Sequence, residues 1–210
     1  MGSQERRVRE RADTRLRILD AARELFVRDG YAATTMRAIA DRVEYTPTAI
    51  YHHFANKQAL LMELCTNDFA ALAAAFRKIE PTDDPRDSLG KIGAAYVQFG
   101  IEHPMQYQLL FMTRRPPAAA AELARREEPG ESAYAILRAS CAKAVTAGVF
   151  RARYDSPDEV AQMCWGSLHG LVALHIAMGE GSTIPWRDLR KTSARLSDAL
   201  MRGLTRGSRK

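Results

Sequence analysis

Apolar residues recur along the whole chain at spacings of three and four positions, and no stretch alternates with the period of two that marks a β-strand. The commonest residues include alanine, leucine, arginine and glutamate, which are strong helix formers. We therefore expect an all-α fold of about nine helices. The expected helices cover residues 14–29, 35–43, 47–54, 57–79, 87–103, 104–111, 131–147, 157–178 and 184–206. Residues 114–130 are expected to form a loop with room for one or two loose helical turns.

Start and stop signals mark the boundaries near the N-terminus. The first helix is expected to begin at Asp13 or Thr14, either of which can cap a helix, and to end at Gly30. Thr46 is a further capping residue, and Pro47 takes the first helical position, where its missing N–H costs nothing. These signals predict a very short third helix directly after a tight turn.

The short helices over 35–43 and 47–54 have the form of a helix-turn-helix, and we expect the second of them to read DNA. Thr48 can hydrogen-bond a base edge or place its methyl group against that of thymine. Tyr51 and Lys57 are suited to phosphate contacts. The residues expected to contact DNA are Thr35, Arg37, Thr46, Pro47, Thr48, Tyr51, His52 and Lys57.

The alternative is an ordinary αα-hairpin inside a helical bundle. Such a hairpin has no need of an outward surface of threonine, proline, tyrosine and histidine. Arg37 and His52 suit base and backbone contacts equally, and His53 can pack, cap or touch phosphate. The pattern therefore favours a DNA-reading surface and leaves the division of contacts open.

A set of landmark residues with fixed spacings runs through 14–64. The landmarks are Ala22, Leu25, Phe26, Gly30, Tyr31, Thr34, Thr35, Ile39, Ala40, Ile50, Tyr51, His53, Phe54, Asn56 and Lys57. In these positions the segment resembles the N-terminal DNA-binding domain of the tetracycline-repressor (TetR) family of transcriptional regulators. One position departs from the family pattern, because the turn often contains Gly-Val where this chain has Glu44-Tyr45.

A weaker set of landmarks lies in the C-terminal part. They are Tyr96, Val97, Phe99, Glu102, His103, Pro104, Tyr107, Leu110, Phe111, Trp165, His169 and Gly170. They resemble a C-terminal domain of part of the TetR family that carries a Trp-His-Gly (WHG) pattern. The resemblance implies a dimerising domain that usually contains a small-molecule pocket.

Aromatic and methionine side chains with a few polar groups describe many ligand pockets, although each of them suits an ordinary core equally well. No charged residue is obviously buried among the candidates, which favours an uncharged, apolar effector. The pocket candidates are Tyr96, Phe99, Met105, Tyr107, Phe111, Cys141, Met163, Trp165 and His169.

Two of the expected helices offer faces for a second copy of the chain. Small residues on 157–178 permit close approach by another helix, and apolar residues on 184–206 form a packing seam. A homodimer also suits the proposed recognition helix, because two such helices related by a two-fold axis cover a palindromic site. The alternative is that both faces serve the core of their own subunit. The expected interface residues are Gly166, Gly170, Ala173, Ala177, Leu189, Leu196 and Leu200.

The composition is that of a globular protein, with 46% hydrophobic and 27% charged residues among 210, which excludes a disordered chain. The net charge is +6, and the positive excess lies at the two ends. We expect a basic arm over 1–13, a DNA-binding domain over 14–64, a ligand-binding and dimerisation domain over 65–206, and a basic tail over 207–210. The arm is either a phosphate-seeking element or a solvated terminus.

Enzyme and metal-binding functions find no support in the motifs. The three cysteines lie far apart without a C-x-x-C pair, and there is no phosphate-binding glycine loop, so we expect no metal or cofactor. Ser167 stands in the wrong position between Gly166 and Gly170 for a nucleophile motif. No targeting segment is apparent, and the most apolar stretch, 168–178, is too short to span a bilayer. A cytoplasmic protein is therefore expected.

Together these patterns predict a dimeric, all-helical transcriptional regulator that binds double-stranded operator DNA. A small-molecule effector would release it from DNA by favouring a state in which the two recognition helices are spread apart. One rival is a constitutive DNA-binding factor without an effector. Another is a helical enzyme or ligand carrier with a helix-turn-helix that does not bind DNA.

Overall fold

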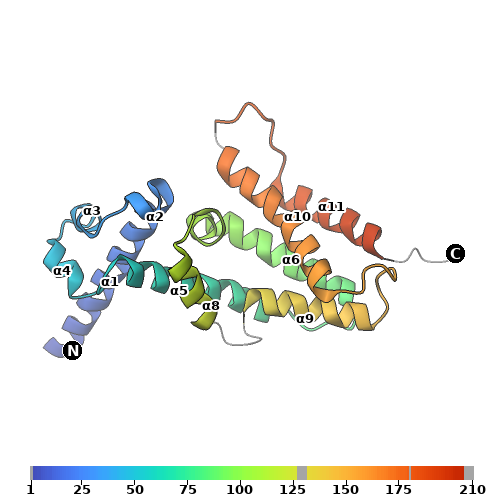
Figure 1. Ribbon diagram of the computed structural model, residues 1–210, viewed down its shortest axis with the longest axis horizontal. Coiled ribbons are helices and arrows are strands. Elements are labelled where there is room, and N and C mark those ends of the chain that lie inside the picture. Colours follow the sequence, from blue (N-terminus) through green and yellow to red (C-terminus); the bar gives the residue numbers. More distant parts are fainter. Residues whose placement is uncertain (1, 127–131, 180, 206–210) are drawn as a thin grey trace. The chain divides into compact units, whose positions relative to one another are not determined.

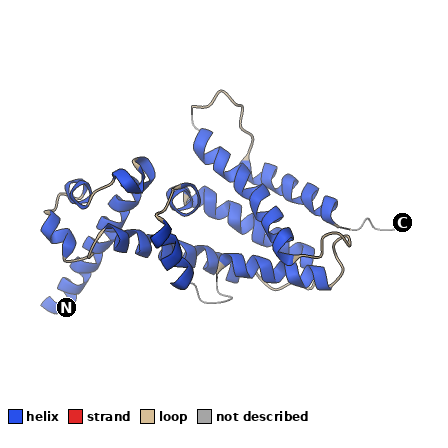
Figure 2. Cartoon of the chain, viewed as in Figure 1, coloured by secondary structure: helices blue, strands red, loops and turns tan. Residues whose placement is uncertain are grey.

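The computed structural model describes residues 2–126, 132–179 and 181–205, and within these ranges the chain is helical and contains no β-strand (Figures 1 and 2). This confirms the all-α prediction. The elements are α1 (Ser3–Arg28), α2 (Gly30–Ala33), α3 (Met36–Arg42), α4 (Pro47–Tyr51), α5 (Lys57–Arg77), α6 (Pro85–Glu102), α7 (Pro104–Tyr107), the π-helical turn η1 (Gln108–Met112), α8 (Pro117–Arg126), α9 (Ala133–Thr146), α10 (Pro157–Met178) and α11 (Leu189–Leu204). The two helices beyond the expected nine are α2 and α8.

The start of α1 differs from the prediction. The helix begins at Ser3, so Asp13 and Thr14 lie in its interior and residues 3–13 are helical turns, not a separate arm. The reason is that residues 3–13 contain no proline or glycine, and their Glu and Arg residues are good helix formers. The predicted end is confirmed, since Gly30 follows the last turn with a left-handed φ of 82°.

The loop expected over 114–130 contains a helix of 10 residues, longer than the one or two loose turns expected there. Pro117 begins α8, because proline suits the first helical turn and an alanine run follows it. Two other helices begin at the aspartate caps Asp84 and Asp188, where the prediction placed their starts at residues 87 and 184. The predicted tail over 207–210 lies outside the described residues.

The chain forms two compact units. Unit 1 comprises Met1–Asp68 with Met105–Arg126, and unit 2 comprises Phe69–Pro104 with Glu127–Lys210. This division differs from the expected boundary after residue 64, because α5 runs through it without a linker and α7, η1 and α8 belong to unit 1. The turn η1 packs on α1 and buries Leu109 and Leu110.

The core of unit 1 forms where α1 packs against α2 and α3. Ile18, Ala22 and Phe26 of α1 are fully buried, as the predicted apolar stripe requires. Ile39 of α3 and Ile50 of α4 are equally buried. This packing fixes the short helices although neither is long enough to be stable alone.

The core of unit 2 is built from α6, α9, α10 and α11, which pack on one another. Gly93 of α6 permits a close approach, because a Cβ atom there would lie 2.9 Å from Cδ1 of Leu168. The bundle is therefore tight at Gly93, between α6 and α10. On the α11 side, Leu189 and Leu204 are buried.

Candidate nucleic-acid interface

The turn between α3 and α4 is a Schellman motif with a glutamate at the position that usually holds glycine. The amide of Tyr45 donates to the carbonyl of Ala40 at 3.0 Å, and the amide of Glu44 donates to that of Asp41 at 3.3 Å. Glu44 has a φ of 61°, in the left-handed region. The Glu-Tyr departure from the family pattern thus preserves the geometry of the turn at the cost of backbone strain.

Replacing Glu44 with glycine is expected to stabilise unit 1 by about 0.5–1 kcal/mol. Relief of the left-handed strain, roughly 1–2 kcal/mol, exceeds the extra entropy that glycine gives the unfolded chain. Chemical denaturation monitored by circular dichroism measures the difference. Glu44→Ala is the control, because it removes the same side chain without relieving the strain; equal effects of both variants would contradict the assignment.

Two threonines cap the helices of the motif as predicted. The Thr35 hydroxyl accepts from the Ala38 amide at 3.0 Å, and the Thr46 hydroxyl accepts from the Ala49 amide at 3.2 Å. Both residues are exposed. Because a hydroxyl that accepts in a cap keeps its own O–H donor, each remains able to donate to a phosphate oxygen.

The face of α4 that points away from the core is polar and accessible. Tyr51 keeps 53% of its surface exposed, which is unusual for so large a ring, while Ile50 beside it is fully buried. All the residues predicted to contact DNA are exposed except Lys57, which is half-buried. The exposed members are Thr35, Arg37, Thr46, Pro47, Thr48, Tyr51 and His52.

Arg15 of α1 holds the chain that follows α4, and sequence reasoning did not find this residue. Its Nη1 donates to the carbonyl of His53 at 2.6 Å, its guanidinium lies 4.1 Å from the centre of the Phe54 ring, and it pairs with Glu63 of α5. Burial, followed by the charges of Arg11 and Arg15, lowers the pKa of His53. His53 is half-buried, and its lowered pKa favours the neutral imidazole. The choice between packing and a phosphate contact stays open.

Lys57 takes a structural position that the sequence did not predict. Its Nζ donates to the carbonyl oxygens of Tyr31 and Thr34, each at 2.6 Å, and lies 4.3 Å from the centre of the Tyr31 ring. Burial lowers the pKa of this ammonium. Since the amino group is engaged by backbone carbonyls, the expected phosphate contact stays a prediction without support from this geometry.

Lys57→Met is expected to destabilise unit 1 by about 1.5–3 kcal/mol, the range for hydrogen bonds to a charged group. The carbonyls of Tyr31 and Thr34 would lose their donor, while methionine keeps the packing against the ring. Thermal unfolding measures the loss. Arg37→Met is the matched control, because Arg37 is exposed on α3 and its replacement leaves the melting temperature unchanged; an unchanged melting temperature in Lys57→Met as well would contradict the structural role.

Comparison with known proteins places this geometry in a family. The model of bacterial regulatory proteins of the tetR family matches residues 18–64, and that of the tetracyclin repressor-like C-terminal domain matches residues 89–200, more than half of the chain. The chain belongs to the TetR family. Its members and the relatives below are helix-turn-helix transcriptional regulators.

The relatives match mainly over the DNA-binding segment. The regulator UidR of Escherichia coli K12 is 39% identical over 69 residues, which are 33% of this chain and 35% of UidR. The regulator TcmR of Streptomyces glaucescens is 30% identical over 149 residues, 66% of this chain and 63% of TcmR. The chain thus spans about a third of the length of UidR and less than two thirds of TcmR.

Solved structures show the same fold over almost the whole chain. The TetR family regulator PfmR from Thermus thermophilus has a TM-score of 0.68 and 24% identity, and covers 91% of this chain and 97% of its own. A tetR-family regulatory protein from Rhodococcus RHA1 has a TM-score of 0.72 and 23% identity, and covers 92% and 98%.

In unit 2 the WHG landmarks form a hydrogen-bonded cluster. Trp165 Nε1 donates to the Tyr96 hydroxyl at 3.0 Å, and that hydroxyl lies 3.2 Å from Nδ1 of His169. Burial lowers the pKa of His169, which favours a neutral imidazole that accepts from Tyr96. Three of the nine pocket candidates are therefore brought together around one hydroxyl group.

The other pocket candidates are distributed over both units. Met105, Tyr107 and Phe111 belong to unit 1, where Tyr107 and Phe111 contact edge to face at 5.0 Å. In unit 2, Cys141 of α9 meets Cys164 of α10 in a thiol hydrogen bond, which together with burial raises the pKa of the Cys141 thiol. A ligand pocket that these residues share stays a prediction.

The predicted dimer faces are exposed to different degrees. Gly166 and Ala177 of α10 are exposed, and a Cβ atom on Gly166 or Gly170 would meet no atom within 4 Å. Leu189 of α11, in contrast, is only 7% exposed and serves the core of its own subunit. Leu189 is therefore not available to a second subunit. Leu196 and Leu200 are partly exposed and stay candidates for the interface.

Proposed function

We propose that the protein is a cytoplasmic homodimer that represses transcription by binding a palindromic operator, and that a small-molecule effector releases it. The observation that carries the proposal is the exposed hydrogen-bonding face of α4 above a fully buried Ile50. A hairpin that only packed in a bundle has no need of this set of exposed hydrogen-bonding groups, among which Tyr51 keeps 53% of its surface.

The residues of α4 divide into two roles in this proposal. Thr48 and Pro47 lie at the start of the helix, the part of a recognition helix that approaches base edges, so they read sequence. Tyr51 lies at the last position of the helix and donates its hydroxyl to a phosphate. Arg37 on α3 and the exposed arginines of α1 add charge that favours DNA of any sequence.

The dimer is supported by an apolar surface on α10. Leu174 and Met178 are 51% and 43% exposed, and Ala173 and Ala177 lie beside them on the same helix. Contiguous apolar surface of this kind marks an interaction site in a soluble protein. The helices α5 and α10 are long and apolar enough for a membrane by length and composition alone, and a dimer interface accounts for the exposed part of α10.

An effector is supported by the polar cluster of Tyr96, Trp165 and His169, because a few polar groups among aromatic rings can orient a small ligand. Relatives differ in the direction of control: FasR of Mycolicibacterium smegmatis is an activator and AcnR of Corynebacterium diphtheriae a repressor. The fold of the ketosteroid regulator KstR2 of Mycobacterium tuberculosis is similar, at a TM-score of 0.68.

The test is a DNA-binding assay on an operator selected from random sequence. Tyr51→Phe is expected to weaken binding by about 5- to 150-fold on every sequence, because the dimer loses one hydrogen bond per protomer at about 0.5–1.5 kcal/mol each, without a change in salt dependence. Thr48→Ala is expected to relax preference at one base pair of each half-site by about 1–3 kcal/mol. Arg37→Met is expected to reduce the slope of log affinity against log salt by about one for each phosphate that the arginine neutralises.

Thr146→Ala is the matched control, because Thr146 is exposed on α9 in the other unit. Wild-type behaviour of all three α3–α4 variants would reject the interface. Operator binding that no metabolite weakens would support a constitutive DNA-binding factor and reject the effector.

A further inference from the structure

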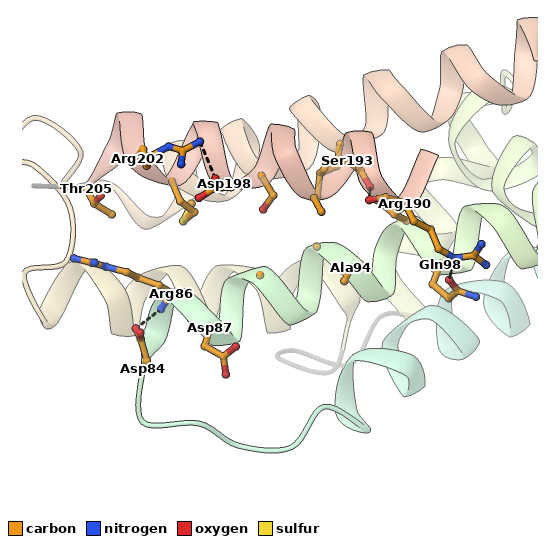
Figure 3. Close-up of a pocket in the computed structure, with 17 residues that line it drawn as sticks. Asp84, Arg86, Asp87, Ala94, Gln98, Arg190, Ser193, Asp198, Arg202 and Thr205 are labelled. Atoms are coloured by element: carbon orange, nitrogen blue, oxygen red, sulfur yellow. Dashed lines mark hydrogen bonds and ion pairs between the residues drawn. The ribbon is translucent and has the colours of Figure 1, made fainter. Parts of the chain in front are cut away.

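A groove of about 580 Å³ runs between α6 and α11 in unit 2, away from the polar cluster of Tyr96 (Figure 3). Its ends are marked by Arg190 with Gln98 and by Arg86 with Thr205, so the two helices run antiparallel along it. A volume of this size is within the range of pockets that hold drug-sized ligands. None of the nine sequence-predicted pocket residues lines it.

Small residues line the groove on both helices. They include Gly90 and Ala94 of α6 and Ala194 and Ser197 of α11. Helices pack about 8–10 Å apart, a distance that larger side chains would fill. A Cβ atom added at Gly90 would meet no atom within 4 Å, so there the groove is open space.

The middle of the groove is apolar. Val97 of α6, Leu168 of α10 and Met201 of α11 contribute side chains to its lining. Because apolar surface is stabilised when it is removed from water, this stretch favours a hydrocarbon body over a polar one.

Most charged side chains at the Arg86 end of the groove already have a partner within the protein. The Asp84 carboxylate caps α6 by accepting from the Arg86 amide at 2.8 Å, Asp87 pairs with Lys91 at 2.8 Å, and Asp198 pairs with Arg202 at 2.7 Å. Among the described residues the Arg86 guanidinium has no carboxylate partner, and Figure 3 shows it extended toward Thr205. The Arg86 guanidinium is therefore the cation of this end that is left to bind a ligand, and the Asp84 carboxylate, which caps the helix, lies two residues from it.

The opposite end also carries a cation. Nε of Arg190 donates to Oε1 of Gln98 at 2.9 Å, so this guanidinium keeps its charge but is partly engaged, while that of Arg86 is not. From residue 86 to residue 98 the helix rises roughly 18 Å. The groove thus offers its freer cation at the Arg86 end, with a long apolar floor beside it.

The proposed dimer surface lies on another face of α10. Around α10, Leu168 and Gly170 are separated by roughly 160° at 100° per residue, so the groove and the small-residue face point in opposite directions. Around α11 the two surfaces adjoin, since the lining residue Ser193 and Leu200 are separated by only about 20° on the same count. A ligand in the groove therefore lies away from the small-residue face of α10 and beside the leucines of α11.

We propose that this groove binds an elongated amphiphile with a carboxylate head, the head on Arg86 and the hydrocarbon chain along Val97, Leu168 and Met201. Only the regulatory consequence, a change in operator affinity, rests on the proposed function. Binding itself is a property of unit 2 and needs no DNA.

The experiment is isothermal titration of the full chain, without DNA, with dodecanoate below its micelle concentration. Dodecanol, butyrate and dodecyltrimethylammonium are the comparison probes. Dodecanoate is expected to bind at least tenfold more tightly than each of them, because only it has both the chain and the negative head. Arg86→Gln is expected to weaken dodecanoate at least tenfold and to remove its advantage over dodecanol.

Two variants fill the groove, Ala94→Phe and Ala194→Phe, and both positions are exposed, so the added rings do not enter the core. Each is expected to abolish dodecanoate binding with the melting temperature unchanged. The matched controls are Ala139→Phe on α9 and Arg195→Gln on α11, both exposed and outside the groove lining.

Equal affinity for dodecanol and dodecanoate would overturn the carboxylate assignment. Dodecanoate binding that survives both phenylalanine variants would overturn the groove assignment and place the ligand elsewhere. None of these titrations uses DNA, so they test the groove even if the protein proves not to bind an operator. Conversely, operator binding by the protein would not make up for a failure of dodecanoate to bind.

Discussion

Replacing Asp68 with asparagine is expected to lower the free energy of unfolding of unit 1 by about 3 kcal/mol. Asp68 of α5 pairs with Arg23 of α1, and the two side chains are only 7% and 13% exposed. Breaking a buried ion pair leaves the remaining charge desolvated without its partner, which costs about 3–5 kcal/mol. Denaturation followed by circular dichroism measures the loss.

The pair of Glu24 with Arg42 is the matched control, because it joins α1 to α3 at the surface, with side chains 36% and 53% exposed. Glu24→Gln is expected to cost less than about 0.5–1 kcal/mol. A double-mutant cycle of Arg23→Met with Asp68→Asn is expected to give a coupling of about 1 kcal/mol or more. A loss in Asp68→Asn no larger than in Glu24→Gln would contradict the role of the buried pair.

The helix-turn-helix could be predicted because its determinants are local. Thr35 and Thr46 each accept from an amide three residues along the chain, so the capping residue and its helix are visible together in the sequence. Gly30 is similar, since its left-handed φ depends on the end of α1 beside it. The turn was harder, because Glu44 takes the glycine position and tertiary packing overrides its local preference.

Contacts between distant segments could not be predicted. Arg23 and Asp68 are 45 residues apart, and Lys57 reaches the carbonyl of Tyr31 across 26 residues. Some arginines and lysines pair inside the domain and others stay available for DNA. Only the packing of the helices decides between these two roles. The groove beside α11 was missed for a related reason: its signal is small residues on two helices about a hundred residues apart.

Gly170→Glu is expected to convert the proposed dimer into a monomer without unfolding it. A Cβ atom at Gly170 would meet no atom of its own subunit within 4 Å, so the substitution begins in open space in the protomer. In a close helix pair, however, the same side chain would separate the two copies of α10 and bring two carboxylates together. Light scattering after gel filtration is expected to report 23.4 kDa, the mass of a single chain.

Loss of the dimer should also be visible on DNA. A monomer has one recognition helix instead of two. Its operator affinity is expected to fall by about 10²–10⁴, because no second recognition helix is held at a high effective concentration near the second half-site. Gly170→Ala is the control: its methyl group fits the open space, and both the dimer and the operator affinity should persist. If Gly170→Glu instead keeps the mass of a dimer and wild-type operator affinity, the small-residue face of α10 is not the interface.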